Sequence, residues 1–147
     1  YSWAGVQTCA LPILSGAAAV IANDIDPVAL HVAGRNAAAN GVVLQSEPAD
    51  LLRVDAAPPA EVILVGDLFY ERRQAERLLR VLRRWSEAGA LVVIADAGRP
   101  FAPREGVREL HAVEVGVNPD LEGVSRRRVR LFGLRGSACQ STPCTLS

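Results

Sequence analysis

Three aspartates each stand at the end of a short apolar run, a position in which a carboxylate can bind a ligand. They are Asp24, Asp67 and Asp96. Short unbroken apolar runs are typical of parallel strands buried on both faces. The carboxyl ends of such strands meet at one edge of the sheet, where ligands bind and where an acid commonly accepts hydrogen bonds from two ribose hydroxyls. We therefore expect Asp24 to bind a ribose and the other two carboxylates to lie along the same edge.

Each of these aspartates also has a structural interpretation, because Asp is common as a cap of helices and turns. For Asp96, capping explains the residue at least as well as a functional role. For Asp67 it explains less, since the aromatic residues Phe69 and Tyr70 follow in the next loop, although aromatic residues also suit a hydrophobic core. For a fourth acid, Asp50, the loop position favours a turn cap over an acceptor for an adenine amino group.

The residues that follow Asp24 predict a helix with clear boundaries. Asp26 occupies the N-cap position, Pro27 the first helical position, and Gly41 the end, where a left-handed residue is favoured. This arrangement leaves Asp24 without a purely local role, which favours a functional one.

Hydrophobic periodicity and turn residues predict the remaining elements. Strands are expected at residues 11–14, 18–22, 42–44, 61–67, 91–95, 112–117 and 125–134, and helices at residues 27–40, 72–88 and 104–110. The last two strands are expected to be antiparallel neighbours. The alternation of strands and helices predicts an α/β fold with a mostly parallel sheet and a C-terminal antiparallel hairpin.

Arginine supplies all 16 basic residues of the chain. Many of them lie on the predicted helix at residues 72–88 and within residues 126–130. As functional interpretations, the arginines of the helix could bind an acidic partner, and those of the strand could bind a phosphate group. A solvated helix face and an exposed strand face explain the two clusters better.

The composition excludes several classes of protein. The formal net charge is zero, so there is no electrostatic reason to expect a nucleic-acid or membrane partner. The three Cys residues lack the spacing of metal ligands, and no metal site is expected. No apolar run has membrane-spanning length and no signal peptide is recognisable, so we expect a cytoplasmic protein. The chain lacks Met, which indicates a fragment or a processed product.

Three motifs, in this order, resemble the class I S-adenosylmethionine-dependent methyltransferases: NDIDPVAL, VILVGDLFYE and ADAGRPF. The strongest resemblance is to the protein-lysine methyltransferases that modify the electron-transfer flavoprotein β subunit. It covers residues 15–134, between an atypical N-terminal segment (1–14) and a loose C-terminal tail (135–147). It implies a Rossmann-like methyltransferase sheet, S-adenosyl-L-methionine as the cofactor, and an acceptor that is a protein lysine or a small amine.

The resemblance also implies how the cofactor is bound. Asp24 matches the acceptor of the ribose hydroxyls, and Ile25 lies beside the adenine. Asp50 falls near the adenine-binding position. Gly16 is the one glycine close to the place of the family's glycine-rich turn.

For methyl transfer, the resemblance implies two catalytic residues and an entrance for the substrate. Asp67 and Tyr70 match an acid-x-x-Tyr motif beside the methyl group and the incoming amine. Phe69 lies within this motif, and Asp96 and Arg99 match a loop that shapes the substrate entrance. No metal is required for this chemistry.

The chain departs from the family at its start. The family opens with a strand and a G-x-G-x-G turn, whereas this sequence has YSWAGVQTCALPILSG. The first strand and its glycine-rich loop are therefore expected to be missing or replaced. Two alternatives stay open: a degenerate, non-catalytic domain, and a nicotinamide-cofactor oxidoreductase, in which Asp24 would also bind a ribose.

Overall fold

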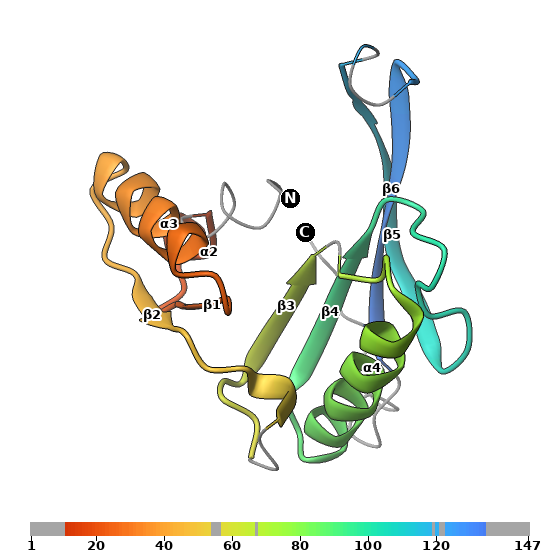
Figure 1. The fold of residues 1–147 in the computed structure, drawn as a ribbon, viewed down its shortest axis with the longest axis horizontal. Coiled ribbons are helices and arrows are strands. Elements are labelled where there is room, and N and C mark those ends of the chain that lie inside the picture. Colours follow the sequence, from red (N-terminus) through yellow and green to blue (C-terminus); the bar gives the residue numbers. More distant parts are fainter. Residues whose placement is uncertain (1–10, 54–56, 67, 119, 121–122, 135–147) are drawn as a thin grey trace. The chain divides into compact units, whose positions relative to one another are not determined.

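The computed structural model describes residues 11–53, 57–66, 68–118, 120 and 123–134 (Figure 1). The chain divides into two compact units, Tyr1–Asp55 and Ala56–Ser147. Each unit has its own sheet, and the two are considered separately below.

The first unit is a βαβ arrangement preceded by a short helix. Its elements are α2 (Leu11–Leu14), β1 (Ile21–Asn23), α3 (Pro27–Ala39), β2 (Gln45–Glu47) and the 3-10 helix η1 (Leu51–Arg53). Strands β1 and β2 are parallel, with Ile21 opposite Gln45 and Asn23 opposite Glu47. Helix α3 is the crossover connection that parallel neighbours require.

Helix α3 has the boundaries that the sequence predicts. The Asp26 carboxylate accepts a hydrogen bond from the Val28 N–H at 2.8 Å, and Pro27 begins the helix. Asn40 is the C-cap, and Gly41 follows with φ +69°. Because side chains disfavour this left-handed conformation, glycine suits the position.

The core of the first unit is small. Ala22 from β1 packs with Leu30 and Ala33 from α3, and the half-buried Leu44 lies against them. Ala37 of α3 is also buried. Because three of the four buried residues described in this unit are alanines, little apolar surface is removed from water.

The second unit holds a four-stranded mixed sheet with the order β3-β4-β6-β5. Its elements are β3 (Val62–Gly66), α4 (Arg72–Glu87), β4 (Leu91–Asp96), β5 (Val107–Gly116) and β6 (Arg126–Leu134). Strands β3 and β4 are parallel, whereas β6 is antiparallel to both β4 and β5.

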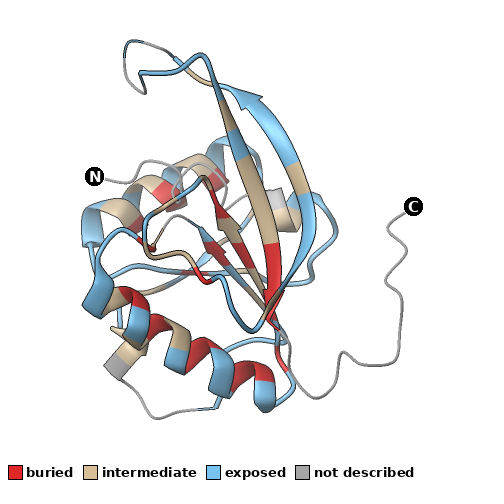
Figure 2. Ribbon diagram, turned by 90° about the vertical axis from the view of Figure 1, so that its right-hand side faces the viewer, coloured by how far each residue is buried: buried red, intermediate tan, exposed pale blue. Residues whose placement is uncertain are grey.

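Helix α4 is amphipathic and contributes much of the core of the second unit. Its buried residues recur every three or four positions, as expected for a helix with one apolar side. They are Ala75, Leu78, Val81, Leu82, Trp85 and Ser86. Figure 2 shows buried residues along one side of the helices and on the neighbouring strands. The largest fully buried side chains include Phe69, Leu82, Val92 and Ile94.

Three predicted elements are wrong. Residues 11–14 form helix α2, not a strand, and Pro12 fits near the helix start. Residues 42–44 precede β2, because pairing with β1 sets the strand at Gln45–Glu47. Residues 104–110 form no helix: β5 begins at Val107, which pairs with Leu134 of β6.

The α/β class and the C-terminal antiparallel hairpin are confirmed, but the pairing is not mostly parallel. Among the described strands, two pairs are parallel and two are antiparallel. The long β5 and β6 account for this balance, since the same β6 pairs with both β4 and β5. None of the described helices is long and apolar enough to cross a membrane.

Candidate functional site

Asp24 lies immediately after β1, at the carboxyl end of this parallel strand. Its side chain is exposed, and Oδ1 accepts a hydrogen bond from the Asp26 N–H at 2.9 Å. The expectation that Asp24 lacks a local role is therefore wrong: the carboxylate helps to form the turn into α3. A carboxylate offers about four lone-pair sites, so this bond leaves capacity for two hydroxyl donors.

Asn23 is a residue of this region that the sequence analysis missed. Its side-chain amide donates to the carbonyl oxygens of Glu47 and Ala49, both at 2.8 Å. The Asp24 N–H also donates to the Glu47 carbonyl, at 3.4 Å. These bonds connect the end of β1 to the end of β2 and to Ala49 beyond it. They fix the backbone that carries the Asp24 carboxylate.

The neighbouring cofactor-site candidates have different surroundings. Ile25 is 72% exposed, so an apolar ring can stack on it without displacing any core residue. Asp50 accepts a hydrogen bond from the Leu52 N–H at 3.1 Å, which supports the turn-cap interpretation of this residue. Gly16 closes α2, where its N–H donates to the Ile13 carbonyl at 2.9 Å.

In the second unit, the predicted transfer residues follow β3. Asp67 lies outside the described residues. Tyr70 is 53% exposed, whereas Phe69 is fully buried in the core. The Phe69 carbonyl accepts a hydrogen bond from the Phe101 N–H at 3.2 Å, so the loop before α4 is tied to the loop after β4.

Asp96 ends β4 with a fully buried carboxylate. It accepts hydrogen bonds from the Gly98 N–H at 2.8 Å and the Arg99 N–H at 3.0 Å. The Arg130 guanidinium lies 3.8 Å from the same carboxylate. Since an unpaired buried carboxylate is costly, these partners explain how Asp96 stays buried. The carboxylate therefore fixes the shape of the loop that carries Arg99.

An open hollow of about 460 Å³ lies beside this loop. It is lined by Ala97, Gly98, Glu109, Arg126, Arg127, Arg128 and Arg130. Cross-strand ion pairs lie on its wall, Arg126 with Glu114 at 3.6 Å and Arg128 with Glu109 at 3.8 Å. Arg126 and Arg128 thus face acidic neighbours on β5, and their exposed side chains support the exposed-strand interpretation of this cluster. In the described part of the chain, no group of three His, Cys, Asp or Glu side chains is placed to hold a metal ion.

The architecture is that of the class I S-adenosylmethionine-dependent methyltransferases. One similar solved structure is the tRNA (uracil-54, C5)-methyltransferase of Pyrococcus abyssi with S-adenosyl-L-homocysteine: TM-score 0.63, 18% identity, 89% of this chain and 32% of that chain. Another is the magnesium protoporphyrin IX methyltransferase of Synechocystis with the same ligand: TM-score 0.59, 13% identity, 89% of this chain and 70% of that chain. At these identities the similarity shows the fold alone.

Within this class, the chain is a distant homologue of the electron transfer flavoprotein β subunit lysine methyltransferases. It is 33% identical to the Danio rerio protein over 109 residues, which is 73% of this chain. It is 37% identical to the Xenopus laevis protein over 87 residues, which is 58% of this chain. The matches span 42% and 35% of these relatives. No protein-family model matches the chain.

Proposed function

We propose that the protein transfers a methyl group from S-adenosyl-L-methionine to an amine, most specifically the side chain of a lysine in another protein. The observation that carries this proposal is the exposed Asp24 carboxylate at the end of β1, in a chain with a methyltransferase fold. The homology to two lysine methyltransferases supports the amine as the acceptor.

Asp24 and its neighbours fit the adenosine part of the cofactor. The carboxylate accepts one backbone hydrogen bond and keeps lone pairs for the two ribose hydroxyls. Ile25 presents an exposed apolar surface for the adenine ring. We assign Asp50 to the adenine amino group as well, and Gly16 to the backbone near the methionine part.

The cofactor supplies an electrophilic methyl group. A lysine amine, with a pKa of about 10.4 in water, must lose its proton before it attacks. We assign Asp67 to orient the amine and to ease this loss. Tyr70, half exposed, is assigned to the wall of the amine channel, where its ring favours a cationic group. Holding the amine in line with the methyl group and excluding water supplies the remaining rate enhancement.

The substrate entrance is assigned to the loop after β4. Arg99 lies in this loop, and the buried Asp96 carboxylate positions its backbone. Phe69 acts through packing, since its side chain is fully buried. Asp96→Asn keeps an acceptor for the loop and is expected to retain substrate affinity better than Asp96→Ala.

The acceptor must be another molecule if it is a lysine, because this chain contains no lysine. Any methyl-lysine found after incubation with a candidate protein therefore comes from that protein. A small amine is the second acceptor class, and it is distinguished by mass spectrometry of the products.

A second candidate function is a domain that retains the fold without catalysis. The described residues before β1 comprise only α2 and a loop with Gly16, and β1 and β3 begin separate sheets. We propose that the family's first strand and glycine-rich turn are missing or replaced here. The expected consequence is weak binding of the methionine part of the cofactor.

Calorimetric titration with S-adenosylmethionine and with NAD separates the candidates. Binding of S-adenosylmethionine alone supports the methyltransferase, binding of NAD alone supports the oxidoreductase, and binding of neither supports the non-catalytic domain. Asp24→Ala is expected to weaken binding by about 100-fold or more, since each of the two lost hydrogen bonds to a charged group contributes about 1.5–3 kcal/mol. Asp120→Ala, at an exposed position, is the matched control.

A transfer assay then tests the catalytic assignments. Asp67→Ala and Tyr70→Phe are expected to lower the rate while cofactor affinity stays unchanged, Asp67→Ala by a factor of about 100 or more. If both variants transfer methyl groups as fast as the parent, the roles given to these two residues are wrong.

A further inference from the structure

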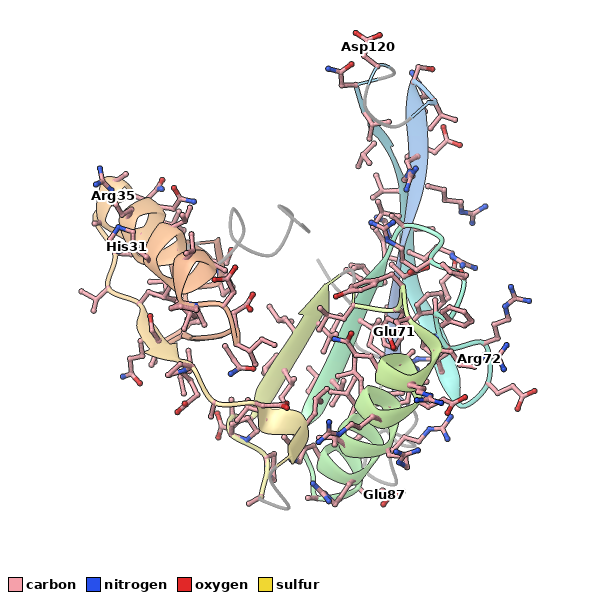
Figure 3. All side chains as sticks on the ribbon, viewed as in Figure 1. His31, Arg35, Glu71, Arg72, Glu87 and Asp120 are labelled. Carbon is pink, nitrogen blue, oxygen red and sulfur yellow. The ribbon has the colours of Figure 1, made fainter. Side chains whose placement is uncertain are left out.

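Helix α4 carries a row of arginines on the side opposite its buried face. Arg73, Arg77 and Arg80 follow one another at spacings of four and three residues, which places them on one side of a helix. Arg73 and Arg80 are exposed and Arg77 is half-buried. Arg84 continues the row by a further four residues. Figure 3 marks the start of this helix by Arg72 and its end by Glu87.

The other arginines of α4 have structural partners. Arg72 stacks over the Phe101 ring, with 5.4 Å from the guanidinium carbon to the ring centre. Arg83 donates to the Glu105 carbonyl at 3.4 Å. Within the described part of the chain, by contrast, the side chains of Arg73, Arg77 and Arg80 form no ion pair or hydrogen bond. Arg73, Arg77 and Arg80 are thus not needed to hold α4 on its sheet.

The row also opposes helix stability. Like charges three or four residues apart on a helix are unfavourable, and α4 carries six arginines against two glutamates, Glu76 and Glu87. Glu76, three residues after Arg73 and four before Arg80, offsets only part of this repulsion. A negatively charged partner would offset the rest.

The charge distribution favours an acidic protein segment over a nucleic acid. Nucleic-acid-binding domains are typically basic as a whole, with a pI above about 9, whereas this chain has zero net charge and a pI of about 6.9. The positive charge is local and extends about 10 Å from Arg73 to Arg80 at 1.5 Å per residue. Carboxylates on one side of a helix have this same spacing, and guanidinium groups bind carboxylates with two parallel hydrogen bonds.

We propose that Arg73, Arg77 and Arg80 form a docking strip for an acidic segment of the protein acceptor. The strip starts three residues after Tyr70, the residue assigned to the amine channel. An acceptor held there presents its lysine near that channel. This last step rests on the proposed methyl transfer, whereas the docking itself does not. Electrostatic steering of this kind acts mainly on the association rate and KM.

The test is fluorescence anisotropy with a labelled helical peptide, carried out without any cofactor. The peptide has three Glu residues at spacings of four and three, and its control has Gln at the same positions. The protein is expected to bind the Glu peptide, to bind the Gln peptide at least tenfold more weakly, and to lose affinity as ionic strength rises.

Two triple variants with the same change in net charge locate the binding. Arg73→Gln, Arg77→Gln and Arg80→Gln together are expected to weaken binding about tenfold. Gln is a good helix former, so α4 should persist, which circular dichroism checks. The control variant combines Arg35→Gln, Arg104→Gln and Arg126→Gln. Its affinity for the Glu peptide is expected to differ less than twofold from that of the parent. Replacing the strip arginines by Lys should retain most of the affinity.

The proposal is overturned if the strip variant binds as the parent does, or if the control variant loses as much. A single-stranded RNA of equal negative charge gives a second test. The proposal is also overturned if this RNA binds the parent protein more tightly than the Glu peptide does and if the strip variant no longer binds the RNA. The peptide assay contains no cofactor, so its outcome does not depend on methyl transfer. A failed transfer assay therefore does not affect the docking proposal, and a failed peptide assay does not affect the proposed cofactor binding. With the cofactor and a protein acceptor that has such a segment, the strip variant should raise KM and leave kcat unchanged.

Discussion

The two units of the chain are stabilised in different ways. The first has a small core around Ala22, Leu30 and Ala33. The second buries large side chains, among them Phe69 and Trp85. Because hydrophobic stabilisation scales with the apolar area buried, the second unit gains far more from packing. The first depends more on hydrogen bonds at its helix cap and strand ends.

The residues proposed for cofactor binding and for methyl transfer lie in different units. The cofactor candidate Asp24 lies in the weakly packed unit, held by bonds around Asn23 and Asp26. Tyr70 and the buried Asp96 lie in the well-packed unit. Ligand-binding elements often come from the less stable parts of a protein. A ligand that binds only the folded form then stabilises that part.

The largest expected effect is in the second unit. Trp85→Ala removes a buried aromatic side chain of α4 and is expected to cost about 3–5 kcal/mol of unfolding free energy. Hydrogen exchange measured by mass spectrometry should show the loss in β3, α4 and β4. Arg104→Ala, at an exposed position, should change exchange little. An equal loss in both variants would contradict the assigned core.

The next effect is in the first unit. Leu30→Ala removes the largest side chain of its buried cluster and is expected to cost about 2–3 kcal/mol, at the low end of such changes because a small core collapses readily. Exchange should rise throughout α3 while β5 and β6 stay protected. If both units lose protection together, they unfold as one cooperative body and the comparison fails.

A smaller effect is expected at the helix cap. Asp26→Ala removes the acceptor for the Val28 N–H and should cost about 1 kcal/mol. Asp26→Ser retains a capping oxygen and should cost only a few tenths of that. Thermal unfolding followed by circular dichroism measures both. Identical losses in the two variants would show that the cap bond contributes little.

The smallest effect is expected at an exposed ion pair. Arg128 and Glu109 lie 3.8 Å apart across β6 and β5, with both side chains largely exposed. Arg128→Ala should change stability by about 0.5 kcal/mol or less. Denaturant unfolding at low and high salt measures this change in the free energy of unfolding. A loss above about 2 kcal/mol would mean that the hairpin contributes more to the unit than its exposure indicates.

The sequence predicts those elements whose signals are local. Helix α3 follows from its Asp26 and Pro27 start, and α4 from its apolar periodicity. The elements that the sequence predicts wrongly depend on pairing with residues far away in the chain. Val107 enters β5 because it pairs with Leu134, which is 27 positions away, and no local pattern records such a pairing.

The same distinction applies to the site. The position of Asp24 after a strand follows from the sequence, and the structure agrees. Its bond to the Asp26 N–H and the two bonds from Asn23 were missed, because they depend on how the turn and β2 fold. Capping by Asp96 was anticipated, but its contact with Arg130 joins strands that only the folded sheet brings together.

The most direct test of the account is hydrogen exchange with and without S-adenosylmethionine. With the cofactor at about ten times its Kd, exchange in β1 and the start of α3 should slow by roughly tenfold, since binding stabilises the folded form by RT ln(1 + [L]/Kd). In Asp24→Ala the same cofactor concentration should have little effect, and β5 should change little in either protein. Unchanged exchange around Asp24 in the parent at every cofactor concentration would contradict the account.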